Sequence, residues 1–266
     1  MRSHGRRKYT VNKRFNKRPR NRQKPNYILL FFILVVSSLL SGGVSYLLSS
    51  DEFDITKISF SGNRLLDSEI IDTECRYAVG QNIYILSKEK LENKILKHSQ
   101  VEEVKIKKKL PADIEIYIKE KTPVAIVSDG KNFYLADKNR YLFHQIKLDN
   151  NNKLPLIELA GIKNLKVGEY CNSNRLKWSY ELLGYAKNEM VNVSKISVDH
   201  SGNICLNMGK NLYVKMGQPD DLERKVSLLR ATLVYRPSIA KKALYIDLSC
   251  PKAPVWKPKE SEQLSS

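Results

Sequence analysis

The side chains most often used for catalysis or metal binding are few and widely spaced in this 266-residue chain. The histidines lie too far apart for an HExxH pair, and the cysteines form no CxxC pair. The phosphate-binding GxxxxGK, dinucleotide-binding GxGxxG and nucleophile-bearing GxSxG motifs are absent from the sequence. The residues concerned are His4, His98, His144, His200, Cys75, Cys171, Cys205 and Cys250. We therefore expect no enzyme active site, no metal or other cofactor, and no small-molecule substrate.

Two alternatives to this expectation stay open from the sequence. In an oxidising compartment one or two disulfides would form, and Cys205 and Cys250 fall on neighbouring predicted strands or their ends. A membrane-anchored hydrolase would require His200, Cys205 and Asp247 to gather around one pocket.

Positive charge is concentrated at the N-terminus. Residues 1–50 hold eleven of the 46 basic side chains and none of the 28 acidic ones. The content of Cys, Gly and Pro excludes a disulfide scaffold and a fibrous protein, and 42% hydrophobic residues argue against global disorder. An arginine-rich arm with Tyr9 and Phe15 among the charges also suits nucleic acid. An adjacent apolar run favours a membrane instead, so we expect no specific nucleic-acid partner.

That apolar run covers residues 27–48, from Tyr27 to Leu48, and contains no charged side chain. As a helix it would rise about 33 Å, enough to cross a hydrocarbon core of about 30 Å. All eleven N-terminal basic residues precede it, which predicts a cytoplasmic N-terminus and an external C-terminal part. The alternative is a cleaved signal peptide with Ser41-Gly42-Gly43 as its cleavage site. The 26-residue basic region before the run and its continuation to Leu48 favour a permanent single span.

The first external segment predicts a small α+β module. Alternation of apolar and polar residues indicates strands, three- and four-residue spacing indicates helices, and Ser87 has the residue type of a helix N-cap. The predicted order is strand 53–60, helix 67–78, helix 87–97, strand 101–109 and strand 113–119. Two helices over one face of a three-stranded sheet would bury a core of their own.

The second external segment predicts a β-rich domain with two helices. Short apolar strands separated by turn residues indicate β-meanders. The expected strands are 124–127, 133–136, 141–144, 196–198, 204–206, 212–215 and 243–248, and the expected helices are 173–188 and 219–235. The last of these strands is expected to end the fold, followed by a flexible tail over residues 251–266.

Several short motifs, in one order along the chain, resemble the FtsQ/DivIB family of bacterial cell-division proteins. Each motif is weakly specific, and their common order carries the resemblance. They are Ile58-Ser59-Phe60-Ser61-Gly62-Asn63, Gly80-Gln81-Asn82-Ile83-Tyr84, Val101-Glu102-Glu103-Val104-Lys105-Ile106, Lys107-Lys108-Lys109-Leu110-Pro111-Ala112-Asp113-Ile114-Glu115-Ile116, Glu120-Lys121-Thr122-Pro123-Val124-Ala125, Tyr134-Leu135-Ala136-Asp137, Leu154-Pro155-Leu156 and Tyr245-Ile246-Asp247-Leu248.

The resemblance implies an α+β fold with a basic cytoplasmic tail (1–26), a transmembrane helix (27–48), a POTRA domain (53–121), a β domain (122–250) and a flexible C-terminal tail (251–266). It implies a single-pass protein of the cell inner membrane with a periplasmic C-terminal domain. It also implies a non-enzymatic scaffold of the division complex that contacts the lipid bilayer, links membrane division proteins and coordinates septal wall synthesis.

The same resemblance implies where partners bind. In the family the β domain binds the small proteins FtsB and FtsL, and its C-terminal strand accepts a partner strand. By position this candidate edge strand is Leu244, Tyr245, Ile246, Asp247, Leu248 and Ser249, with Trp256 as a candidate aromatic anchor. Where the family often has Arg, this chain has Ser249-Cys250-Pro251, so Pro251 should end strand pairing because it lacks an N–H.

A rival interpretation is a POTRA-bearing secretion or outer-membrane assembly factor. It would require a membrane β-barrel of many ten-residue strands, and residues 122–250 are too few and too often interrupted by predicted helices.

Overall fold

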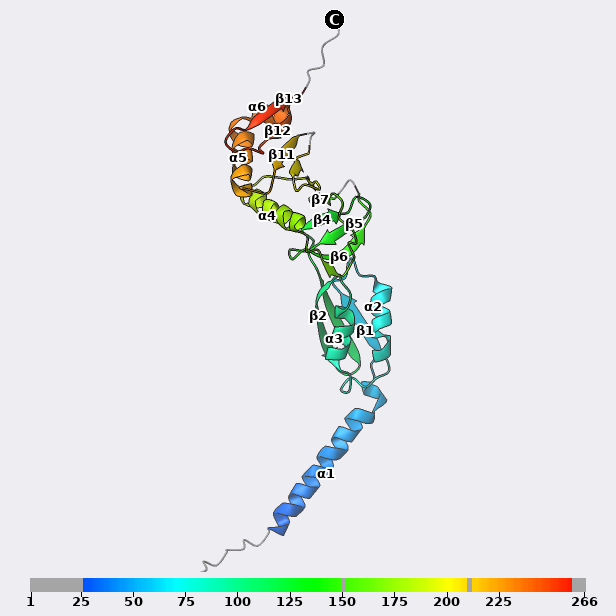
Figure 1. Ribbon diagram of the computed structural model, residues 1–266. Coiled ribbons are helices and arrows are strands. Elements are labelled where there is room, and N and C mark those ends of the chain that lie inside the picture. The colour runs from blue at the N-terminus through cyan, green and yellow to red at the C-terminus, as the bar shows by residue number, and fades with distance from the viewer. Residues whose placement is uncertain (1–25, 150–151, 210–211, 260–266) are drawn as a thin grey trace, which may run out of the picture. The chain divides into compact units, whose positions relative to one another are not determined.

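The computed structural model describes residues 26–149, 152–209 and 212–259 (Figure 1). The chain divides into two compact units, residues 1–50 and 51–266, and each is described by itself. The predicted basic tail lies outside the described residues, except for its last residue, Asn26.

The first unit contributes one apolar helix, α1 (Tyr27–Ser49). Its 23 residues carry no charge, and none of them is buried against the rest of the protein. Their rise of about 34 Å is sufficient to cross a bilayer. By length and composition this helix fits a single-pass membrane protein, as the sequence predicts.

The second unit begins with a three-stranded sheet covered by helices. The strands are β1 (Lys57–Ser61), β2 (Val101–Lys109) and β3 (Asp113–Glu120), in the order β1-β3-β2. β1 runs parallel to β3, and β2 and β3 form an antiparallel hairpin. Between β1 and β2 lie α2 (Ser68–Cys75), the 3₁₀ turn Arg76–Ala78 and α3 (Lys88–Leu96). The predicted strand–helix–helix–strand–strand order is therefore confirmed.

Local sequence signals explain why these helices start where they do. Asp67 accepts a hydrogen bond from the amide of Glu69, and Ser87 accepts one from the amide of Lys90. Such caps satisfy amides at the helix start that have no partner within the helix. One buried face of each helix then packs on the sheet, with Ile71 and Cys75 from α2 and Leu91 and Ile95 from α3.

The first strand is shorter than predicted. Residues 51–53 form a 3₁₀ turn, and the backbone of Ile55 pairs with Gly80 and Gln81 in the interhelical loop. Because these groups are bonded to the loop, the pairing of β1 with β3 starts at Lys57. At its other end Gly62 adopts φ +93°, and a Cβ there would lie 2.1 Å from the carbonyl oxygen of Ile118. This close approach of two backbones requires glycine.

The described residues after Glu120 contain a ten-stranded mixed sheet. Its order is β13-β12-β11-β10-β9-β7-β4-β5-β6-β8. The strands are β4 (Ala125–Ser128), β5 (Phe133–Ala136), β6 (Tyr141–Ile146), β7 (Leu156–Leu159), β8 (Glu169–Tyr170), β9 (Lys195–Val198), β10 (Ile204–Asn207), β11 (Tyr213–Gly217), β12 (Ala243–Asp247) and β13 (Val255–Pro258). The α+β fold class is confirmed, whereas β7, β8 and β13 were not predicted.

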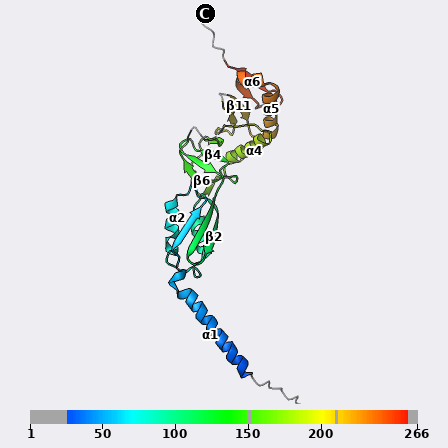
Figure 2. The same ribbon diagram turned by 180° about the vertical axis from the view of Figure 1, so that it is seen from behind.

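Helices cover one face of this larger sheet (Figure 1, Figure 2). They are α4 (Asn174–Asn188), α5 (Leu222–Tyr235) and the short α6 (Pro237–Lys242), of which α6 was not predicted. The apolar positions predicted for α5, such as Leu222, Val226 and Leu229, are buried in the same core as the sheet. The helical periodicity of the sequence therefore identified the packing face.

A short segment of the smaller sheet's module packs against the larger sheet. The carboxylate of Glu120 accepts hydrogen bonds from the amides of Arg64, Leu65 and Leu66, at 2.8 to 3.0 Å. Leu65 packs against a small cluster of buried residues that includes Ile126 and Phe143. Glu120 therefore fixes the loop that carries Leu65 to the β-rich part.

Candidate functional site

The candidate site lies at the C-terminal end of the ten-stranded sheet, where β12 lies between β11 and β13. β12 runs parallel to β11, with Tyr245 opposite Tyr213 and Ile246 opposite Val214. β13 runs antiparallel to β12, with Trp256 opposite Ile246 and Val255 opposite Asp247. In the part of the chain that the structure describes, no strand pairs with the outer side of β13.

This topology corrects one prediction. The strand of Leu244 to Ser249 was expected at the edge, but β13 covers it, so the outer strand is Val255–Pro258. The chain reverses because the Asp247 carboxylate accepts a hydrogen bond from the Ser249 amide and Ala253 donates to the Cys250 carbonyl. Pro251 lies in this turn and ends strand pairing there.

The same strand corrects the expected tail. Residues 255–258 of the predicted flexible segment 251–266 are part of the sheet. Pairing continues to Lys259, whose amide donates to the Lys242 carbonyl at 2.8 Å. The remaining seven residues of that segment, 260–266, lie outside the described residues.

The candidate side chains fall into two groups. Ile246 and Leu248 are buried and belong to the core of the sheet. Leu244 and Ser249 are exposed, Tyr245 and Asp247 are half-buried, and Trp256 is 43% exposed. A partner can therefore touch Leu244, Tyr245 and Trp256 directly, whereas Ile246 and Leu248 hold the strand in place.

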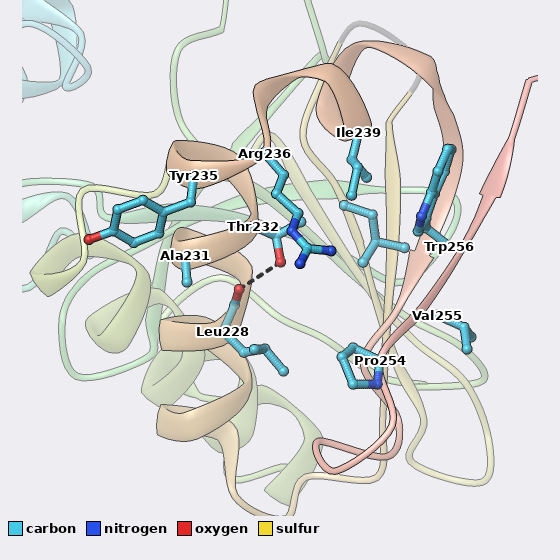
Figure 3. Close-up of a pocket in the computed structure, with 10 residues that line it drawn as sticks. Leu228, Ala231, Thr232, Tyr235, Arg236, Ile239, Pro254, Val255 and Trp256 are labelled. Atoms are coloured by element: carbon cyan, nitrogen blue, oxygen red, sulfur yellow. Dashed lines mark hydrogen bonds between the residues drawn. The ribbon is translucent and has the colours of Figure 1, made fainter.

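An apolar cavity of about 320 Å³ opens beside Trp256 (Figure 3). One wall is α5, and the opposite wall is β13 with the preceding Pro254. The Thr232 hydroxyl is turned back to the Leu228 carbonyl at 2.9 Å, so this side chain already has its hydrogen-bond partner. The lining residues are Leu228, Ala231, Thr232, Tyr235, Arg236, Ile239, Ile246, Pro254, Val255 and Trp256.

A second cavity, of about 340 Å³, lies beside Tyr245 and is lined by Cys205, Tyr213, Val214, Lys215, Leu244 and Tyr245. The Lys215 ammonium lies 4.2 Å from the centre of the Tyr245 ring, a cation–π contact. Burial raises the pKa of the Cys205 thiol above its ordinary value of 9.0, so this cysteine is not an activated nucleophile. The surroundings of Tyr245 suit contact with a protein and do not suit thiol catalysis.

Comparison with known proteins consistently finds bacterial cell division proteins. Residues 53–121 match the family model of the POTRA domain, FtsQ-type. The cell division protein DivIB of Clostridium acetobutylicum is 29% identical, over 77% of this chain and 82% of that protein. DivIB of Clostridium botulinum is 27% identical, over 89% of this chain and 93% of that protein. The cell division protein FtsQ of Syntrophotalea carbinolica is 24% identical, over 69% of this chain and 66% of that protein.

The chain belongs to the FtsQ/DivIB family of cell division proteins. The matched FtsQ-type segment starts at Phe53 and ends just beyond β3, so it includes the whole three-stranded sheet and its helices.

Residues with catalytic potential do not converge in the described part of this FtsQ/DivIB chain. Neither cavity lined by Cys205 includes His200 or Asp247. His200 instead lies against Gly161, where a Cβ would meet its ring at 2.1 Å. Among the described residues no group of three or more His, Cys, Asp or Glu side chains is placed to hold a metal ion.

All four cysteines fall within the described residues and are free thiols. The Cys205–Cys250 pairing weighed from the sequence is therefore not formed, although both side chains are exposed.

Sequence reasoning missed most of the residues around the apolar cavity. Tyr235, Arg236 and Ile239 come from the end of α5 and from α6, and Val255 comes from β13. One usable signal was present, because Pro237 is suited to the first turn of a new helix directly after α5. The Val-Trp pair at 255–256 was a second signal, since both residue types favour strands.

Proposed function

We propose that this FtsQ/DivIB chain is a non-enzymatic, single-pass scaffold of the division complex that binds FtsB and FtsL through the C-terminal end of its β-rich part. The observation that carries the proposal is the exposed outer strand β13 beside an apolar cavity, with Trp256 and Val255 contributing to both. Family membership supplies the context of cell division.

The binding step is addition of a partner strand to β13. An outer strand offers backbone N–H and C=O groups that an extended segment can pair with, and adjacent pockets select its side chains. A large apolar side chain of the partner fits the cavity between α5 and β13, where Trp256 and Tyr235 would lose their exposure to water. Burial of such aromatic side chains dominates the affinity of many interfaces.

The proposed topology follows from the N-terminal charge. The eleven basic residues before α1 orient the helix with the N-terminus in the cytoplasm. The POTRA and β-rich parts then lie in the periplasm, outside the cell inner membrane, where the proposed partners FtsB and FtsL would meet them. Recruitment at this surface, with a second docking surface on the POTRA domain, would connect membrane division proteins to septal wall synthesis.

The test measures binding of an FtsB–FtsL complex to the full chain in nanodiscs by biolayer interferometry. Trp256→Ala removes the aromatic anchor. Trp256→Pro also removes the outward-facing amide of β13, because the Lys259 amide faces β12 and amides alternate along a strand. Each variant is expected to weaken binding at least about tenfold. Tyr170→Ala is the matched control, because Tyr170 is also an exposed aromatic side chain but lies on β8, the opposite outer strand. If both β13 variants stay folded and bind as tightly as Tyr170→Ala, the proposal is wrong.

A cellular test uses a fluorescent fusion of the full chain. We expect the wild type to localise at the division septum and to support septation when it replaces the native copy. The Trp256→Pro and Trp256→Ala variants should fail to support septation at normal expression. Normal septation by both variants would contradict the proposed role of β13.

A further inference from the structure

Four exposed apolar side chains gather at one end of the POTRA domain. Val79, Tyr84 and Ile85 belong to the loop between α2 and α3, and Leu110 is at the tip of the β2–β3 hairpin. Ile85 and Leu110 are the most exposed of them, at 64% and 61%. We call these four residues the apolar rim. Single exposed apolar residues need no explanation, but a cluster on two adjacent loops does.

Backbone and side-chain hydrogen bonds hold the two loops together. The Lys108 ammonium, next to the hairpin tip, donates to the Leu86 carbonyl in the interhelical loop at 2.8 Å. The Ile83 amide donates to the Phe53 carbonyl at 2.8 Å, and the Thr56 amide donates to the Ala112 carbonyl at 3.0 Å. Both loops are thus tied to residues 53–56, which makes the rim one continuous surface.

Residues 53–56 also lie near the start of the second unit, shortly after the apolar helix α1 in sequence. Phe53 is four residues beyond Ser49, the last residue of that helix. Four residues span at most about 14 Å, so the covalent chain keeps Phe53 close to the membrane surface that α1 leaves. The rings of Phe53 and Tyr84 are in contact, with centroids 5.4 Å apart. Tyrosine and other amphipathic aromatic side chains are preferred at the level of lipid headgroups.

The charges beside the rim suit an interfacial position. Lys107, Lys108 and Lys109 lead directly to Leu110, and their long stems can lie along lipid. Their ammonium groups have partners in the protein: the Tyr117 ring for Lys107, the Leu86 carbonyl for Lys108 and Glu115 for Lys109. The acidic side chains at the same end are Asp51, Glu52, Asp54, Asp113 and Glu115. Of these, Glu115 is paired with Lys109. Because the signs are mixed, apolar burial must drive the contact and electrostatic attraction to anionic lipid is secondary.

We propose that the apolar rim inserts into the headgroup–acyl boundary of the bilayer, as a second membrane contact besides α1. A cluster of apolar and aromatic side chains flanked by lysines is the composition of surfaces that lie in this boundary. The contact holds the POTRA domain against the lipid surface and limits its rotation about the short segment after α1. The inference requires that α1 spans the membrane, and it does not depend on partner binding at β13.

The test uses the full chain in nanodiscs whose lipids carry brominated acyl chains, which quench tryptophan fluorescence only at near contact. Leu110→Trp places a probe in the rim. Arg64→Trp is the matched control, because Arg64 is exposed and its amide is bonded to Glu120 at the far end of β3 from the hairpin tip. β3 has eight residues from Asp113 to Glu120, and the seven steps between them separate the two ends by about 23 Å. The native Trp178 and Trp256 give the same background in every variant and are subtracted using the wild-type chain.

We expect the probe at position 110 to be quenched at least about twofold more than the probe at position 64. Ile85→Trp, on the other loop of the rim, should behave like Leu110→Trp, which provides a second measurement if one substitution disturbs folding. Equal quenching at positions 110, 85 and 64 would overturn the proposal. Quenching that appears at the rim only after a partner membrane protein is added would overturn it too, because a protein would then cover the surface.

The rim and the partner-binding end can be tested separately. The double variant Leu110→Ser, Ile85→Ser is expected to bind the FtsB–FtsL complex like the wild type in solution. Conversely, Trp256→Ala should leave quenching of the rim probe unchanged. Each proposal can therefore fail without the other.

Discussion

Ile246 on β12 and Trp256 on β13 lie opposite each other in an antiparallel pair, one buried in the core and the other 43% exposed. Both side chains line the cavity against α5. The pair therefore connects the core of the β-rich part to the surface proposed to bind partners, and the two residues should respond differently to substitution.

Ile246→Ala should lower the free energy of unfolding by about 2–4 kcal/mol, because it removes buried methyl and methylene groups and leaves a cavity. Trp256→Ala should lower it by about 1 kcal/mol or less, because the side chain is only partly buried. Chemical unfolding of the detergent-solubilised chain measures both values. A larger loss of stability for Trp256→Ala than for Ile246→Ala would show that Trp256 mainly supports the fold.

Glu120→Ala should destabilise the loop that carries Leu65. Three amides, those of Arg64, Leu65 and Leu66, would lose the carboxylate that accepts their hydrogen bonds. A hydrogen bond to a charged group contributes about 1.5–3 kcal/mol, and the three bonds share one acceptor, so we expect a loss of about 2–3 kcal/mol. Hydrogen exchange at these three amides should accelerate. The matched control is Glu89→Ala, which removes an exposed carboxylate in the same module and should change stability by less than about 0.5 kcal/mol.

Cys75 should be the least reactive thiol of the folded chain. Burial, followed by the charges of Asp72 and Glu74, raises the pKa of this thiol to about 11. Only the thiolate reacts with alkylating reagents, so native Cys75 should resist iodoacetamide at pH 8, whereas the exposed Cys250 reacts. Mass spectrometry after timed labelling gives the ratio of the two rates. Comparable rates in the folded chain would contradict the buried position of Cys75, and labelling after unfolding is the control.

The ion pair between Lys225 and Asp220 should make stability depend on acidic pH. The Lys225 side chain is fully buried and donates to Asp220 and to the Gln218 carbonyl. The hydrogen bond from Lys225 lowers the pKa of the Asp220 carboxyl below its ordinary value of 3.8. The stabilisation is therefore fully present above pH 3.8 and is lost as the pH falls through the lower pKa of the folded state.

Asp220→Asn should flatten the dependence of unfolding free energy on pH in this acidic range. Asp221→Asn is the matched control, because it removes a neighbouring charge and leaves the Lys225 pair in place. Thermal unfolding at a series of pH values from 2 to 5 gives the comparison. Identical pH profiles for Asp220→Asn and the wild type would exclude the pair as a source of pH dependence.

The membrane helix and the POTRA domain were predictable because their signals are local. An uncharged run from Tyr27 is long enough for a span, and the cap residues Asp67 and Ser87 stand directly before their helices. The alternation of Ile114, Ile116 and Ile118 on β3 matches their burial in the core. Each of these features depends on residues within a few positions of one another, so periodicity and capping are sufficient to detect them.

The sequence by itself determined that this chain has one apolar helix, a POTRA domain and a mixed β-rich part. Only the tertiary structure decided that β13 covers β12, that α5 and β13 enclose a cavity, and that Leu110 lies beside the interhelical loop. The physical reason is that pairing of Val255–Pro258 with Ala243–Asp247 depends on backbone hydrogen bonds, which almost any sequence can make. A short segment rich in Pro and Lys carries little hydrophobic periodicity, so its place at the edge of the sheet is decided by the turn at Pro251 and by the strand it meets.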